Sequence, residues 1–99
     1  MLRYAVMAES KVKQYELMVI FRPRILQKGA ESLVKKMIKE VDGKVGEVDF
    51  WGEREMKYEI DNEERGLYIL FYIQIAKDCV SELRKVLNME PDILRILIV

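Results

Sequence analysis

The sequence predicts an α+β fold of the ferredoxin-like type, a split βαβ arrangement (βαββαβ) with a four-stranded antiparallel sheet and two helices on one face. Three observations lead to this prediction. The chain has 99 residues, which suits one domain and is too short for two. The period of its apolar residues changes in the order strand, helix, strand, strand, helix, strand. A polar segment at 61–66 separates the two strands that follow one another directly.

The first strand is expected at 14–21, where apolar side chains occupy every second position and Pro23 follows the run. The period then lengthens to that of an amphipathic helix, which Gly43 is well placed to end. The apolar face of this first helix consists of Ala30, Leu33, Val34, Met37, Ile38 and Val41.

The second strand is expected at 46–60, and the polar turn at 61–66 sends the chain back into a third strand at 67–75. Every odd position of the third strand is apolar, and several even positions are apolar or aromatic as well. Both faces of this strand are therefore suited to burial, which predicts that it is central in the sheet.

Asp78 is the expected N-cap of the second helix, because a short polar side chain there precedes a new helical period. Pro91 ends this helical segment, and 93–99 closes the chain as the fourth strand. The residues that this helix is expected to bury are Val80, Leu83, Val86 and Leu87.

Right-handed crossovers place the first and third strands side by side in the middle of the sheet and both helices on one face. The other face is left uncovered, and it is more apolar than the surface of a solitary monomer. A partner or a dimer contact is therefore expected there, and the alternative is that loops or the first thirteen residues cover it. The side chains in question are Met18, Ile20, Tyr68, Leu70 and Tyr72.

Composition narrows the possible functions. The 17 basic and 17 acidic residues cancel, so any contact with nucleic acid has to be local. The chain has no histidine and one cysteine, which excludes an internal disulfide and a zinc site built from cysteine and histidine. No metal or cofactor is expected. The longest apolar run, 66–76, is too short for a membrane-spanning helix, and we expect a soluble, non-secreted protein.

No enzymatic activity is expected either. The chain lacks a histidine base and a Gly-rich phosphate loop, and Cys79 is best explained as a small packing or surface residue. The loop Arg22-Pro23-Arg24 could hold an anion, but the glycine-rich cradle of such a site is missing. The segment 65–72 resembles the signature of an RNA recognition motif, but its aromatic residues are in the wrong register. Stacking of bases on Tyr68 and Tyr72 is therefore the alternative, and packing of these rings in the core or against a partner is favoured.

Four ordered segments carry a resemblance to a known family. They are Lys13-Gln14-Tyr15-Glu16 with Ile20 and Pro23, the pattern Trp51-Gly52-x-Arg54-x-Met56-x-Tyr58-x-Ile60, Gly66-x-Tyr68, and Ile93-Leu94-Arg95. Together they resemble the bacterial small-subunit ribosomal protein number six family. The resemblance covers a single domain at 13–99 and leaves 1–12 as an N-terminal extension.

The resemblance implies a ferredoxin-like structural protein without enzymatic activity, located in the cytoplasm on the ribosome, with an organellar ribosome as an alternative. It also implies binding to small-subunit ribosomal RNA in the platform, beside the basic ribosomal protein number eighteen. Such contacts pair with phosphate and position the protein. For Arg54 and Arg95 the alternative is an ordinary surface salt bridge. The RNA-binding residues that the resemblance implies are Lys13, Tyr15, Arg54 and Arg95.

Strict alternation along the second strand places Trp51 in an acidic row with Glu47, Asp49, Glu53, Glu55 and Glu59. Since this strand lies at the edge of the predicted sheet, a basic partner could pair with the row while the tryptophan anchors it. The alternative is a solvated edge whose charges prevent aggregation. The residues expected to contact a protein partner are Trp51, Glu53, Glu55, Met56 and Tyr58.

Two function classes remain at this stage. The first is a structural, RNA-binding component of the small ribosomal subunit that acts together with a basic protein partner. The second is a stand-alone ferredoxin-like module that dimerises through its uncovered sheet face or binds a small ligand.

Overall fold

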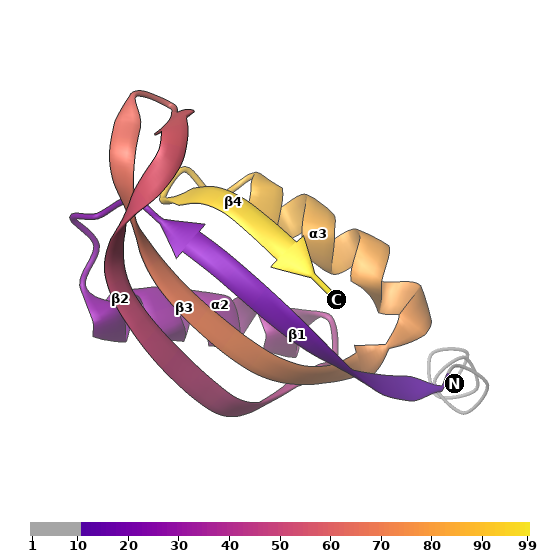
Figure 1. Cartoon of the computed structure of the whole chain (residues 1–99). Coiled ribbons are helices and arrows are strands. Elements are labelled where there is room, and N and C mark those ends of the chain that lie inside the picture. Colours follow the sequence, from indigo (N-terminus) through magenta and orange to yellow (C-terminus); the bar gives the residue numbers. More distant parts are fainter. Residues whose placement is uncertain (1–10) are drawn as a thin grey trace.

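The computed structural model describes residues 11–99, and its elements follow the predicted order (Figure 1). A short 3₁₀ turn, η1 (Lys77–Cys79), precedes the second helix. The remaining elements are β1 (Val12–Phe21), α2 (Gln27–Glu40), β2 (Lys44–Ile60), β3 (Glu63–Ala76), α3 (Val80–Asn88) and β4 (Ile93–Ile98).

The four strands form one antiparallel sheet in the order β2-β3-β1-β4, and both helices lie on the same face of it (Figure 1). Strand β1 pairs with β3 on one side and with β4 on the other, and β2 pairs with β3. The predicted ferredoxin-like fold and the central position of the first and third strands are confirmed.

The core lies between the sheet and the two helices. Alternation assigns the odd residues of β1 and β3 to this layer, and they are buried there because each strand turns successive side chains to opposite faces. Helix α2 contributes the row at Ala30, Val34 and Ile38, and α3 contributes Leu83 and Leu87. The strand residues with almost no exposed area are Leu17, Val19, Phe21, Ile69, Phe71, Ile73 and Ile75.

The β2–β3 hairpin turn is shorter than predicted. Ile60 pairs with Glu63, so only Asp61 and Asn62 form the loop, and β3 begins at Glu63 instead of position 67. Both loop residues have positive φ angles, 50° and 65°, which is the geometry of the two-residue turn that matches the twist of the flanking strands. Aspartate and asparagine tolerate this conformation better than most residues, so the polar run at 63–66 continues the strand.

The predicted N-cap of the second helix is wrong. Asp78 lies inside the 3₁₀ turn, the N-cap position of α3 is Cys79, and no side-chain hydrogen bond caps this helix. Strand β3 continues as far as Ala76, and the tight turn that follows it moves the first helical residue to Val80.

The C-terminus of α2 is closed by two backbone hydrogen bonds. The N–H of Gly43 donates to the carbonyl of Ile38 at 2.8 Å, and the N–H of Asp42 donates to Lys39 at 3.0 Å. Asp42, with φ of 62°, holds the left-handed position of this motif. Gly43 is needed for a different reason, since a Cβ atom there would collide with Cγ2 of Ile75 and approach Cγ2 of Ile38 to 2.8 Å.

Substituting Gly43 with alanine should therefore destabilise the fold. The added methyl group forces the packing of Ile75 and Ile38 to shift, which should lower the free energy of unfolding by about 1–3 kcal/mol. Gly29→Ala is the matched control, because Gly29 is an exposed residue of α2 and a Cβ there meets none of the described atoms within 4 Å. It should raise stability by roughly 0.5–1 kcal/mol through helix propensity. Urea titrations of both variants check this, and equal shifts would contradict it.

Candidate functional site

The sheet face opposite the helices carries an apolar hollow with a volume of about 550 Å³. All four strands contribute to it, because residues of even number on β1 and β3 and of odd number on β4 point to this face. The lining residues are Glu16, Met18, Ile20, Trp51, Tyr68, Leu70, Arg95, Ile96, Leu97 and Val99.

Strand register orders these side chains in two rows that run across the sheet. In one row, Met18 lies between Leu70 and Leu97. In the next row, Ile20 lies between Tyr68 and Arg95. The position that the sequence predicted for Met18, Ile20, Tyr68 and Leu70 is therefore confirmed, whereas Leu97, with 59% of its surface exposed, was not among the predicted residues.

A β-bulge lies at Trp51, which shares the uncovered face with Asp49 two residues earlier. Phe50 pairs with Ile69 and Gly52 pairs with Tyr68, so Trp51 is an extra residue in β2 without a partner in β3. Gly52 has a φ angle of 88°, a backbone conformation that residues other than glycine rarely adopt.

The indole of Trp51 is held by two polar neighbours. Its Nε1–H donates a hydrogen bond to the carboxylate of Asp49 at 3.1 Å. The guanidinium carbon of Arg54 lies over the ring, 5.1 Å from its centroid, within the range of a cation–π contact. The tryptophan is 41% exposed and borders the hollow, so it is both positioned and available to a partner.

The predicted acidic row around Trp51 holds for Asp49, which shares its face, and is wrong for Glu53 and Glu55. Beyond the bulge, Glu53 pairs with Leu67 of the core layer and therefore points to the helix-facing side of the sheet. There its carboxylate forms an ion pair with Nε of Arg65 at 2.6 Å. In the strand register, Glu55 lies opposite the same arginine. One extra residue shifts the alternation of a strand by one, which separates these glutamates from Trp51.

Met56 and Tyr58 lie on the uncovered side of the hairpin. Met56 is buried, and its Sδ lies 3.4 Å from the place that a Cβ of Gly66 would occupy. Tyr58 is 65% exposed. A small hollow joins both side chains to Tyr68 and Arg95. The structure thus brings these two predicted partner residues to the same face as Trp51.

The four predicted RNA-binding residues do not form one site. On the uncovered face, Arg54 lies over the ring of Trp51, and Arg95 lines the same apolar hollow as Trp51. Lys13 pairs with Ile75 and Tyr15 with Ile73, which directs both to the helix-facing side near the start of β1. Lys13 is exposed, and the ring of Tyr15 is half-buried against the core.

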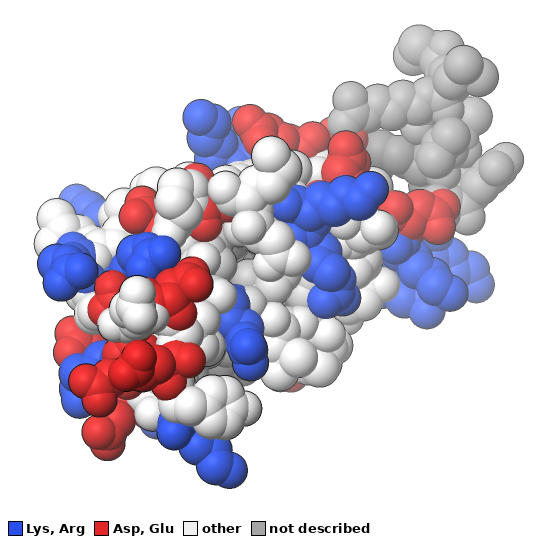
Figure 2. Space-filling model, turned by 90° about the horizontal axis from the view of Figure 1, so that it is seen from above, with Lys and Arg blue, Asp and Glu red and all other residues white. Residues whose placement is uncertain are grey.

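Charges of both signs surround the β2–β3 hairpin. Figure 2 looks onto the end of the molecule to which this hairpin points, and it shows carboxylates gathered there with basic side chains between them. This end lacks the uniform positive field of a protein that binds nucleic acid without a partner. The exposed carboxylates of the hairpin are Glu53, Glu55, Glu59, Asp61 and Glu64.

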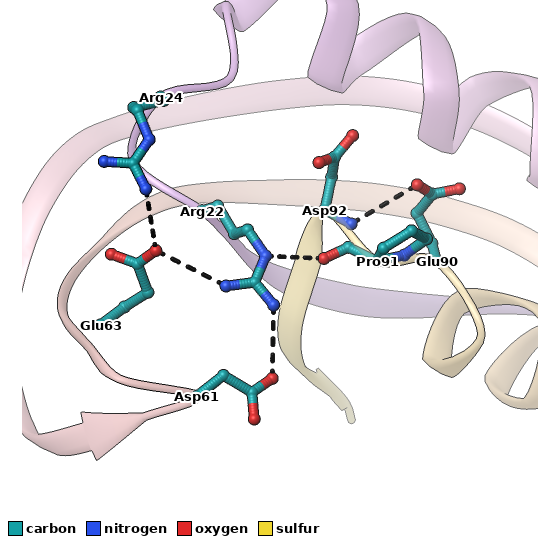
Figure 3. A network of polar contacts seen from close by, with 7 residues as sticks. All are labelled: Arg22, Arg24, Asp61, Glu63, Glu90, Pro91 and Asp92. Carbon is teal, nitrogen blue, oxygen red and sulfur yellow. Dashed lines mark hydrogen bonds and ion pairs between the residues drawn. The ribbon is translucent and has the colours of Figure 1, made fainter.

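The loop after β1 is tied to the hairpin by a polar network (Figure 3). Arg22 donates from Nε to the carbonyl of Pro91 at 2.8 Å, and its terminal nitrogens lie 3.5 Å from carboxylate oxygens of Asp61 and Glu63. Arg24 lies 3.4 Å from the same glutamate. These arginines face the protein's own carboxylates, so the loop is a structural clamp and does not form an anion site.

The described part of the chain offers little support for other chemistry. Within 11–99, no group of three or more histidine, cysteine, aspartate or glutamate side chains could hold a metal ion. None of the helices in that range is long and apolar enough to cross a membrane. Cys79 is half-buried and packs against the core, as predicted.

Comparisons with known proteins agree on one family. The family model described as Ribosomal protein S6 matches residues 14–99. The small ribosomal subunit protein bS6 of Corynebacterium urealyticum is 38% identical over 87 residues, which cover 85% of this chain and 92% of that protein. The bS6 protein of Streptomyces griseus is 33% identical, with 85% and 91% covered.

A solved structure is similar as well. The crystal structure of 30S ribosomal protein S6 from Thermotoga maritima gives a TM-score of 0.77 at 31% sequence identity. The match covers 90% of this chain and 87% of that one. The fold and the sequence therefore indicate the same family.

Removing the guanidinium of Arg22 should loosen the hairpin. Arg22→Ala leaves the carbonyl of Pro91 without this donor and removes the cation between Asp61 and Glu63, which should lower the free energy of unfolding by roughly 1–3 kcal/mol. Arg24→Ala is the control, because its side chain is largely exposed and should contribute less than about 0.5 kcal/mol. Denaturant titrations test the pair. Equal losses would show that Arg22 is only a surface ion pair.

Proposed function

The chain belongs to the ribosomal protein S6 family, and we propose that it binds ribosomal RNA in the platform of the small subunit together with the basic ribosomal protein number eighteen. Proteins of this family are structural components of the small ribosomal subunit, located on the cytoplasmic ribosome, and are not enzymes.

One observation carries the proposal. Trp51 and Arg95 line one apolar hollow on the sheet face opposite α2 and α3, and Arg54 lies over the ring of Trp51. Tryptophan is one of the residue types that most often dominate protein–protein binding energy. Arginines beside it supply the local positive charge that a chain without net charge needs for phosphate contact.

The roles divide between the partner protein and the RNA. Trp51 and Tyr58 form the apolar contact with the basic protein, and the largely buried Met56 packs beneath it. Glu53 and Glu55, on the opposite side of the same hairpin, supply exposed carboxylates to its positive charges. Because Trp51 and these two glutamates lie on opposite faces of the hairpin, the partner wraps around the edge of β2 instead of lying on one face.

The RNA contacts fall at two places. Arg54 and Arg95 pair with phosphates at the hairpin end of the uncovered face. Lys13 and Tyr15 form a second, separate contact at the start of β1. Among residues 11–99, no carboxylate lies within ion-pair distance of Arg54 or Arg95, which argues against the alternative that they are ordinary surface salt bridges.

Binding to a platform fragment of small-subunit RNA tests the proposal. The purified protein should bind tightly only when the basic partner is present, because the chain carries too little positive surface to bind alone. Arg54→Ala and Arg95→Ala should each lower the slope of log affinity against log salt concentration by about 1. Arg84→Ala is the matched control, because Arg84 is an exposed residue of α3, and it should leave the slope unchanged. Absence of binding with and without the partner would contradict the proposal.

The anchor role of Trp51 has its own test. Trp51→Ala should weaken binding to the basic partner by about 2 kcal/mol, roughly thirtyfold, because the indole would be buried in the contact. Met89→Ala removes an exposed apolar side chain at the end of α3, on the helix side of the molecule, and should have no effect. Calorimetric titration without RNA measures both. An unchanged affinity for the Trp51 variant would mean that the partner docks elsewhere.

A further inference from the structure

The uncovered sheet face has a property that goes beyond the proposed function, because it is complementary to itself. Its middle is apolar, and charges of opposite sign lie at its two ends. We propose that, away from the ribosome, this face packs against the same face of a second copy of the chain and forms a two-fold symmetric dimer.

Strand register supplies the geometry. The row Met18–Leu70–Leu97 crosses the middle of the face. Arg95 belongs to the row two residues to one side of it, and Glu16 belongs to the row two residues to the other side. Since a strand rises about 3.4 Å per residue, the arginine and the glutamate lie about equally far from the middle row, at roughly 7 Å.

A two-fold axis along the middle row therefore brings opposite charges together. Rotation about this axis turns the second sheet to face the first and reverses its strands. The row of Arg95 then lies over the row of Glu16 in the partner copy, and the reverse contact forms at the other end. Each copy thus contributes one arginine and one glutamate to two equivalent ion pairs.

The apolar side chains of the face fit this arrangement. Leu97 is 59% exposed and lies on the axis row, so it would meet its own counterpart. Trp51 and Val99 extend the apolar area to either side. Two sheets that pack face to face with such side chains lie about 10 Å apart, and an apolar centre with a polar rim is the usual anatomy of an interface.

Pairing through the edge of β2 is a weaker alternative. The exposed edge of β2 is interrupted by bulges near Val45 and Trp51 and bears many charges. Bulges and charges on an edge strand prevent the regular ladder that edge-to-edge dimers need. The face, in contrast, offers a continuous apolar surface.

The dimer would also exclude the proposed ribosomal contacts. Trp51 and Arg95 lie inside the symmetric interface, and the same side chains are proposed to bind the basic protein and RNA. Self-association is measured without RNA or partner, so a monomer result would overturn the dimer and leave the ribosomal proposal standing.

Sedimentation equilibrium of the full chain, over concentrations from low micromolar to nearly millimolar, tests the dimer. The wild type should show a monomer–dimer equilibrium. Arg95→Glu and Glu16→Arg should each weaken it by about tenfold or more, because symmetry repeats every unfavourable contact. The double variant with both changes should restore association to near the wild-type level, since the charges are then exchanged in both copies. Failure of the double variant to recover would overturn the proposed axis.

Leu97→Lys places two like charges on the axis and should abolish the dimer. Met89→Lys, at an exposed position on the helix side of the molecule, is the matched control and should leave the equilibrium unchanged. Circular dichroism of both variants checks that they are folded. A wild-type chain that stays monomeric throughout the series, or a Leu97 variant that still dimerises, would overturn the proposal.

Discussion

The rest of the structure depends on the burial of one face of a four-stranded sheet beneath two helices. The alternating residues of β1 and β3, among them Phe21, Phe71 and Ile73, lose nearly all of their exposed surface in this layer. Each fully buried side chain of this size contributes roughly 1.5–3 kcal/mol, and together they offset the conformational entropy of the ordered chain. Because the two helices cover a single face, the same alternation that builds the core leaves a second set of apolar side chains uncovered. The binding surface is therefore a direct consequence of how the core is made.

The bulge at Trp51 determines what this surface can do. A regular strand would keep Glu53 and Glu55 in line with Asp49 and Trp51 on the uncovered face, whereas the extra residue sends the two glutamates to the other side. The strand loses regular pairing with β3 at this point, and the left-handed conformation of Gly52 makes the distortion possible. In return, an aromatic ring is held between Asp49 and Arg54 at the border of the apolar hollow.

The fold, most of the core and the residues of the uncovered face could be predicted from the sequence, because each depends on a hydrophobic period that single residues do not disturb. The family was also predicted correctly from ordered motifs between Lys13 and Arg95, and the match to the family over 14–99 confirms it. Three local features were not predictable in this way. The hairpin turn depends on φ angles at Asp61 and Asn62, the start of α3 depends on the tight turn after Ala76, and the acidic row is interrupted by the bulge. A glycine in the middle of a long strand, as at Gly52, was the one signal of that bulge in the sequence.

The central claim is that the uncovered sheet face is the surface by which this protein docks. Hydroxyl-radical footprinting of the full chain, free and in complex with platform RNA and the basic ribosomal partner, tests it most directly. The account predicts protection of Trp51, Met18 and Leu97 in the complex, with Leu26 and Met89 on the helix side remaining as reactive as in the free protein. Protection of Leu26 and Met89, with the sheet face left reactive, would contradict it.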